Sequence, residues 1–115
     1  EGVVLTGFIR GERLNQVMTN AGLFVLPSYH EGLPIALLEA LSYDLDVLVS
    51  DIPANTLSCL DRSDFFRVGN VDELSRALQR KTQSAAPRTY DLRPYDWDEI
   101  CTQTLDVYSQ ILRKS

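Results

Sequence analysis

A chain of 115 residues is long enough for one compact domain with its own core and too short for two. Its net charge of -5 and its pI near 4.7 argue against a nucleic-acid partner but allow one small anionic ligand held by backbone dipoles. No apolar run approaches the roughly 20 residues that span a bilayer. Cys59 and Cys101 lack metal-ligand or redox spacing, so a buried, reduced pair in a cytosolic protein is expected.

Short apolar runs alternate with helical patterns along the chain. The expected strands, in chain order, cover 3–6, 23–26, 47–50 and 65–68. Helices are expected over 12–20, where apolar residues recur at helical spacing, and over 34–43, where Pro34 suits the first turn. A short, weaker helix is expected from Ala54.

The last two helices are predicted from their starts. Asn70 and Asp96 each precede a glutamate, Glu73 and Glu99, at the third helical position, where it can reach back to the cap's amide. The terminal helix then carries a long, mostly apolar face. Residues 81–94 are polar, contain two prolines and show no periodicity, so a surface connection is expected there.

This order of elements predicts an α/β fold with a Rossmann-like, mostly parallel sheet flanked by helices, half of a doubly wound sheet. Residues 1–115 are expected to form a single domain. In such sheets the ligand crevice lies beyond the carboxyl ends of the strands, which directs attention to residues 27–40.

Residues 27–40 combine a strand end, a glycine-containing loop and a helix N-terminus. The free amides and the dipole of a first helical turn favour a phosphate or carboxylate. Gly32 lets a ligand approach the backbone, and Pro34 cannot donate. The expected donors are therefore the amides of Gly32, Leu33 and Ile35.

Glu39 is the only charge on an otherwise apolar helix. It is expected either to bind sugar hydroxyls or to be a solvated side chain on an exposed stripe. Glu31 lies eight positions earlier, and both carboxylates can point into one crevice. A paired acid site for hydrolysis is conceivable, but a ligand held at both ends fits better beside a phosphate cradle. His30, alone in the loop, is read as solvated or as a hydrogen-bonding spacer.

The stretch 27–40 resembles the signature of retaining glycosyltransferases of the GT-B fold, specifically glycosyltransferase family 4. Their frame reads P-S-x-x-E-G-x-x-x-x-x-L-E-A, with two glutamates separated by seven residues. This chain matches it at Glu31, Gly32, Leu38, Glu39 and Ala40. The similarity extends over residues from about 3 to 112 and implies the donor-binding, C-terminal half of a GT-B fold, without its first βαβ elements.

The resemblance implies a role for each matching residue. Glu39 would bind the ribose of a UDP- or GDP-sugar, and catalytic Glu31 would face the donor sugar and its diphosphate link. Amides from Gly32 to Ile35 would hold sugar hydroxyls or the distal phosphate. A loop at Gly7, Phe8 and Ile9 would lie against the base. No metal or cofactor is implied.

The resemblance also implies partners outside this chain. These are an N-terminal acceptor domain and a pair of basic residues upstream, so the fragment alone should be inactive. The parent enzyme would be cytoplasmic, with peripheral association with a membrane. The terminal helix of the family packs partly across to the other domain, so Trp97 and Tyr108 are expected to be exposed or involved in self-association here.

The chain departs from the family in two places. Asp44 and Asp46 stand where the loop after the second helix usually has Gly and then Pro, and an acidic residue is replaced near Leu57 and Ser58. The alternative reading is therefore a non-catalytic module that binds sugar nucleotides or a partner. A receiver-like signalling domain would need an acidic cluster after the first strand, and a phosphate-loop ATPase would need a Gly-rich loop ending in Lys-Ser or Lys-Thr. Neither is present.

Overall fold

The computed structural model describes residues 2–84 and 86–114 and shows an α/β fold. Its sheet has three parallel strands in the order β1-β2-β3, namely β1 (Phe24–Leu26), β2 (Val47–Ser50) and β3 (Phe65–Phe66). The helices are α1 (Glu12–Asn20), α2 (Ile35–Ser42), α3 (Val71–Ser84) and α4 (Trp97–Lys114). Short 3-10 turns are η1 (Pro53–Asn55), η2 (Arg62–Asp64) and η3 (Arg93–Tyr95).

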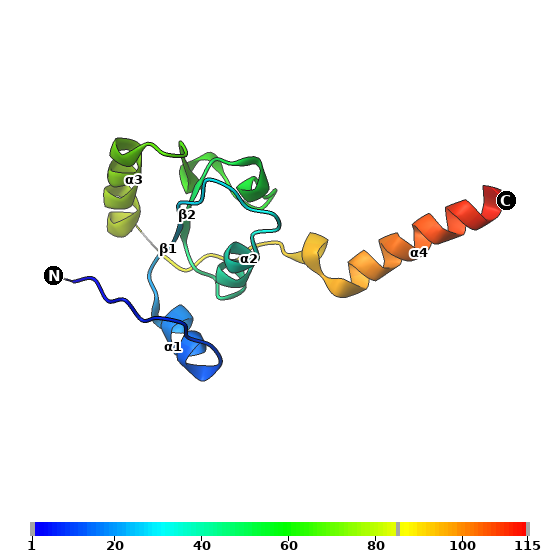
Figure 1. Ribbon diagram of the computed structural model, residues 1–115, viewed down its shortest axis with the longest axis horizontal. Coiled ribbons are helices and arrows are strands. Elements are labelled where there is room, and N and C mark those ends of the chain that lie inside the picture. Colours follow the sequence, from blue (N-terminus) through cyan, green and yellow to red (C-terminus); the bar gives the residue numbers. More distant parts are fainter. Residues whose placement is uncertain (1, 85, 115) are drawn as a thin grey trace.

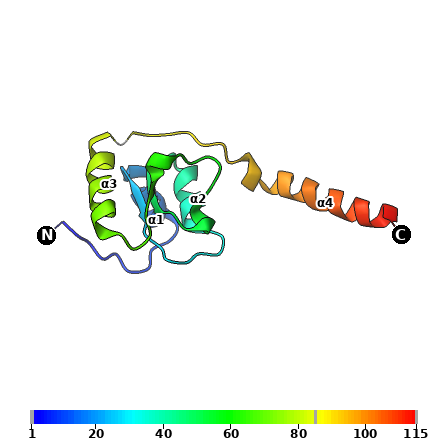
Figure 2. The ribbon, with the colours of Figure 1, turned by 90° about the horizontal axis from the view of Figure 1, so that it is seen from above.

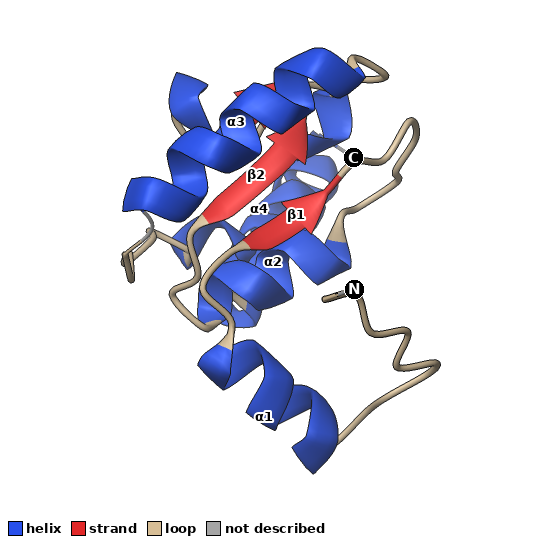
Figure 3. Ribbon diagram, turned by 90° about the vertical axis from the view of Figure 1, so that its left-hand side faces the viewer, coloured by secondary structure: helices blue, strands red, loops and turns tan. Residues whose placement is uncertain are grey.

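The central strand β2 is buried on both faces, as its continuous apolar run predicts. Val47 and Val49 pack into one cluster with Leu37 and Leu41 of α2. Leu48, whose side chain points to the opposite face, packs with Ala77 of α3. Helices α2 and α3 therefore cover opposite faces of the sheet (Figures 1 and 3).

Most predicted elements are confirmed, with shifted ends. The ranges 12–20 and 47–50 agree fully, whereas β1 and β3 are shorter than expected and the short helix after residue 53 is a 3-10 turn. The strand predicted over 3–6 is wrong. Those residues lack regular structure, and Val3, Val4 and Leu5 are 83%, 81% and 94% exposed. A strand needs a neighbouring edge for its hydrogen bonds, and no described strand pairs with this segment.

The cap residues predicted for α3 and α4 are confirmed, but the return bonds from their glutamates are not. Asn70 accepts a hydrogen bond from the amide of Glu73 at 2.9 Å, and Asp96 accepts one from Asp98 at 2.8 Å. The reciprocal bonds do not form. The Glu73 carboxylate accepts from the Arg67 amide at 3.2 Å, and Glu99 bonds to Gln103.

Helix α4 follows η3 and projects away from the rest of the molecule (Figures 1 and 2). All of its described residues are exposed, including Trp97 at 78% and Tyr108 at 61%, as expected. The expected buried cysteine pair is only partly confirmed. Both thiols are free, but Cys59 is half-buried and Cys101 on α4 is exposed. No helix in the described ranges is long and apolar enough to cross a membrane.

Candidate functional site

Three loops follow the carboxyl ends of the strands: 27–34 after β1, 51–52 after β2 and 67–70 after β3. The strands are parallel, so these loops meet at one edge of the sheet. Asp51 joins the last two loops, since its amide donates to Phe66 at 3.0 Å and its carboxylate accepts from Val68 at 2.8 Å. This edge is the ligand-binding position expected of a doubly wound sheet.

The loop after β1 is fixed by two serines. Ser28 donates its hydroxyl hydrogen to the carboxylate of Glu31 at 2.7 Å. Ser50, at the end of β2, donates to the backbone carbonyl of Ser28 at 2.6 Å. Glu31 is half-buried in this arrangement and so has a defined position relative to the sheet.

The N-terminus of α2 follows this loop without a side-chain cap. The amide of Ile35, an expected donor, is already used, because it donates to the carbonyl of Leu33 at 2.8 Å. Among the described residues, no backbone acceptor takes the amides of Ala36 and Leu37, which sequence reasoning did not single out. Gly32 is exposed, and a Cβ built there would meet nothing within 4 Å. The backbone at this turn is therefore open to a ligand.

Glu39 lies at the fifth position of α2, about 6 Å along the axis from Ile35. It is half-buried. Within the described part of the chain, its carboxylate has no hydrogen-bonding or ionic partner, while its backbone carbonyl accepts from Ser42. A half-buried carboxylate without a partner retains its capacity to accept hydrogen bonds from a ligand.

Gly7, Phe8 and Ile9 are not brought to this loop. The segment before α1 lies with α1 at the lower side of Figure 1, away from the cyan loop that leads into α2. Phe8 is 90% exposed, and Ile9 is half-buried.

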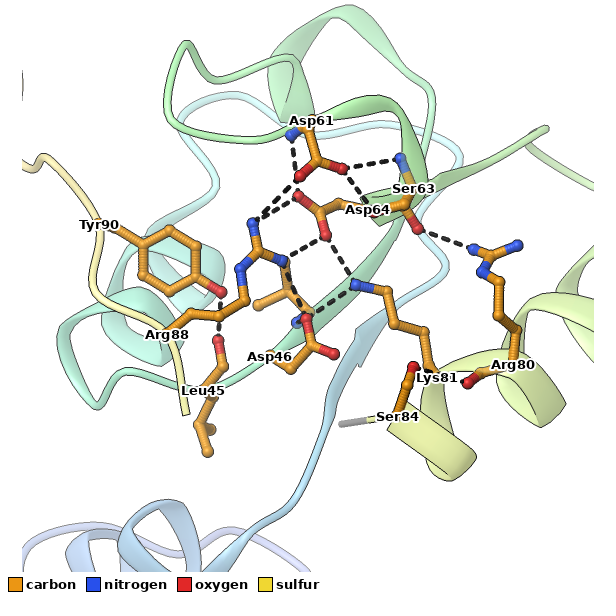
Figure 4. A network of polar contacts seen from close by, with 11 residues as sticks. Leu45, Asp46, Asp61, Ser63, Asp64, Arg80, Lys81, Ser84, Arg88 and Tyr90 are labelled. Carbon is orange, nitrogen blue, oxygen red and sulfur yellow. Dashed lines mark hydrogen bonds and ion pairs between the residues drawn. The ribbon is translucent and has the colours of Figure 1, made fainter. Parts of the chain in front are cut away.

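A buried ionic cluster lies at the opposite ends of the strands (Figure 4). Asp46 precedes β2 and Asp64 precedes β3, and both accept hydrogen bonds from Lys81, at 2.8 and 2.7 Å. Arg88 bonds to the same two carboxylates. The surface connection predicted over 81–94 is therefore wrong at both cations. Lys81 belongs to α3 and is only 5% exposed, and Arg88 is half-buried.

Two carboxylates and two cations meet in this cluster, and the contacts shift the pKa values of Asp64 and Arg88. Burial alone would raise the pKa of Asp64, but hydrogen bonds from Arg88 and Lys81 outweigh it and hold that pKa below its ordinary value. The bond to Asp64 in turn raises the pKa of Arg88. Tyr90 lies beside Arg88 and donates to the carbonyl of Leu45, and burial raises the pKa of Tyr90 to about 12. Because the cluster lies away from the carboxyl ends of the strands, its role is structural.

The departures at Asp44 and Asp46 have a structural explanation. Asp44 adopts a left-handed conformation, with a φ of 58°, which Gly adopts without steric cost. Asp46 anchors the ionic cluster. The fold accommodates both residues.

A parallel sheet between helices, with an uncapped helix and a glycine loop at its carboxyl edge, places the chain in the class of Rossmann-like α/β domains. The family model for glycosyl transferases group 1 matches residues 1–84. Because that match covers most of the chain, the chain belongs to this family.

Three relatives illustrate the similarity. The UDP-Gal:alpha-D-GlcNAc-diphosphoundecaprenol alpha-1,3-galactosyltransferase of Escherichia coli is 37% identical over 70 residues, covering 57% of this chain and 18% of the relative. The alpha-galactosylglucosyldiacylglycerol synthase of Streptococcus pneumoniae is 33% identical over 52 residues, covering 45% and 14%. The N,N'-diacetylbacillosaminyl-diphospho-undecaprenol alpha-1,3-N-acetylgalactosaminyltransferase of Campylobacter jejuni is 25% identical over 107 residues, covering 85% and 28%.

The chain thus spans less than a third of the length of each of these relatives. No solved structure matches it.

Proposed function

We propose that this chain is the donor-binding, C-terminal part of a retaining glycosyltransferase of family 4, which moves a sugar from a UDP- or GDP-sugar to an acceptor. The observation that carries the proposal is the frame from Pro27 to Ala40, folded as strand end, glycine loop and uncapped helix at the carboxyl edge of a parallel sheet. The family membership and the glycosyltransferase relatives support it.

Each group in this frame has a proposed role. Glu39 accepts hydrogen bonds from the ribose hydroxyls, because its carboxylate is half-buried and has no partner among the described residues. Glu31, held by Ser28, is the catalytic carboxylate that faces the donor sugar and its diphosphate link. The amides of Gly32 and Leu33, together with those of Ala36 and Leu37, supply hydrogen bonds and the positive helix end to the distal phosphate or the sugar hydroxyls.

The remaining parts of the proposed enzyme lie outside this chain. An acceptor domain and a basic pair that grips the diphosphate complete the site, so glycosyl transfer by the 115 residues alone should be undetectable. The base is proposed to lie against Gly7, Phe8 and Ile9, which requires their segment to move toward the crevice. We place the parent enzyme in the cytoplasm, in peripheral contact with a membrane.

The test is a titration of the chain with UDP and with GDP, followed by protein NMR so that millimolar dissociation constants can be measured. Glu39→Gln keeps the size of the side chain and removes its charge. It should weaken nucleoside diphosphate binding ten- to a hundredfold, which corresponds to about 1.5–3 kcal/mol for a charged hydrogen-bond acceptor. Thermal stability should change little.

Glu99→Gln on the exposed helix α4 is the matched control, because it makes the same chemical change away from the crevice. Unchanged affinity in a Glu39→Gln variant that still unfolds cooperatively would end the ribose assignment. A wild-type chain that binds neither nucleotide would end the donor-binding proposal itself.

A further inference from the structure

Hydrogen bonds in series connect a buried side chain to the carboxylate of Glu31. The Asn55 amide donates to the carbonyl and to the hydroxyl oxygen of Ser50, at 3.1 and 3.2 Å. The Ser50 hydroxyl donates to the carbonyl of Ser28 at 2.6 Å, and the Ser28 hydroxyl donates to Glu31 at 2.7 Å. Every donor in the series bonds to the next residue along it, so the series has a direction. It runs from η1 through the end of β2 to the loop after β1.

The Ser50 hydroxyl makes its hydrogen bond just beyond the point where the backbone pairing of β1 with β2 ends. The pairing of β1 with β2 ends at Leu26 and Val49, and the next residue of the first strand, Pro27, has no amide hydrogen to continue it. Beyond this point the hydroxyl of Ser50 is what ties the loop to β2.

The two residues at the start of this series, Asn55 and Ser50, are polar at buried positions where an apolar side chain is usual. Ser50 and Asn55 are each 0% exposed. Within the described residues, the Asn55 side-chain oxygen is the one buried side-chain polar atom without a hydrogen-bonding partner. An unsatisfied buried acceptor costs stability, so this asparagine serves something other than packing. What it does in the structure is orient Ser50.

The same loop is held on its other flank. Gly69, in the loop after β3, has a φ of +77°, and a Cβ added there would lie 3.3 Å from the ring of Tyr29. Tyr29 therefore packs against the loop after β3, while its neighbour Ser28 is held by β2. The residues that precede Glu31 are therefore contacted by β2, through one hydrogen bond, and by the loop after β3, although the Tyr29 side chain is 78% exposed.

We infer that Ser50 and Asn55 are positioning residues, which act through Ser28 to hold Glu31 against the sugar of the bound donor. This inference rests on the proposed donor-binding function. A positioning role for Ser50 and Asn55 differs from a packing role in its effect on ligand binding. The series ends on the carboxylate proposed to face the sugar, whereas Glu39, proposed to bind the ribose, lies on α2 and outside the series.

The test compares Ser50→Ala, Ser28→Ala and their double variant with the wild-type chain. Ser84→Ala is the control, since it removes a hydroxyl that donates to a backbone carbonyl on the remote helix α3. Affinities for UDP-galactose and for UDP are measured by protein NMR, at a temperature below the unfolding transition of every variant. If the wild-type chain binds only guanine nucleotides, GDP-mannose and GDP replace them. Amide exchange over 29–33 is measured without ligand.

Loss of Ser50 should weaken UDP-galactose binding about five- to tenfold, the effect of one hydrogen bond, and leave UDP binding within about twofold. Amide exchange over 29–33 should accelerate. Since the two serines act in series, the double variant should bind UDP-galactose no more weakly than Ser28→Ala. Where Ser50→Ala does not fold, Ser50→Cys, which keeps the volume and has a weaker donor, should give a smaller change in the same direction.

Equal weakening of UDP-galactose and UDP by the Ser50 variants would show a general structural effect and overturn the inference. So would additive effects of the two serines, or unchanged amide exchange over 29–33. If the wild-type chain binds no nucleotide at all, the proposed function fails, and the exchange measurement alone decides whether Ser50 positions this loop.

Discussion

Replacing Lys81 by methionine should destabilise the domain more than any surface change on α3. Lys81 is 5% exposed and is hydrogen-bonded to Asp46 and Asp64, which are 5% and 0% exposed. Methionine fills a similar volume but leaves two buried carboxylates to share Arg88. The cluster then carries a net negative charge in a water-poor environment.

The magnitude follows from the cost of an uncompensated buried charge. Breaking a buried ion pair by removing one partner typically costs about 3–5 kcal/mol. A small domain has a total unfolding free energy of about 5–15 kcal/mol. We therefore expect Lys81→Met to remove about a fifth or more of the stability of this chain.

The assay is urea unfolding followed by circular dichroism, with Arg80→Met as the matched control. Arg80 is the neighbouring residue on α3, it is exposed, and its guanidinium donates to the Ser63 carbonyl at 2.8 Å. The control should lose less than about 1 kcal/mol. The additional change Asp46→Asn should restore part of the stability of Lys81→Met, because it removes one of the two carboxylates that share Arg88.

The pH dependence provides an independent check. The pKa of Asp64 is held below its ordinary value of 3.8, so its ionised form stabilises the fold above about pH 4, and that stability is lost as the pH falls through the folded pKa. The difference between wild type and Lys81→Met should therefore be largest near pH 7 and shrink below pH 4. A loss in Lys81→Met of less than about 1 kcal/mol at pH 7, or a difference that grows in acid, would refute the reasoning.

Two further predictions concern single residues. Asp44→Gly should raise the unfolding free energy by about 0.5–1 kcal/mol, because Asp44 has a φ of 58° and glycine adopts this conformation without steric cost; an unchanged or lower urea midpoint would contradict this. Wild-type stability should fall between pH 10 and 12, since Tyr90 has a folded pKa of about 12 against an ordinary 10.0, a difference worth at most about 2–3 kcal/mol. Tyr90→Phe should show a shallower fall over this range when unfolding is followed by circular dichroism, and an equally steep fall would exclude Tyr90 as its source.

The position of the candidate site could be predicted from the sequence because it depends on local order. A buried run that ends at Pro27, a glycine and a helix start are consecutive, and parallel strands direct their carboxyl ends to one edge. The occupied amide of Ile35 could not be predicted. It depends on a turn geometry at Leu33 that no residue type in the loop specifies.

The strand predicted over 3–6 shows the limit of a pattern. An apolar β-branched run favours an extended backbone, but a strand forms only when its backbone hydrogen-bonds to another strand. The same limit applies to Lys81 and Arg88. They lie in a stretch without periodicity, and nothing in their sequence neighbourhood indicates carboxylates that are 35 and 17 residues away from Lys81.

Hydrophobic spacing, caps and the Glu31–Glu39 frame by themselves determined the α/β class, the order of the elements and the edge at which the site lies, because these depend on interactions within about ten residues of chain. Only the tertiary structure decided which polar residues are buried, and why. Asp46, Asp64, Lys81 and Arg88 satisfy one another at one end of the strands, and Asn55, Ser50 and Ser28 hold Glu31 at the other. Burial of a polar group is stable only when a partner from elsewhere in the chain arrives to meet it, and that partner is set by the fold.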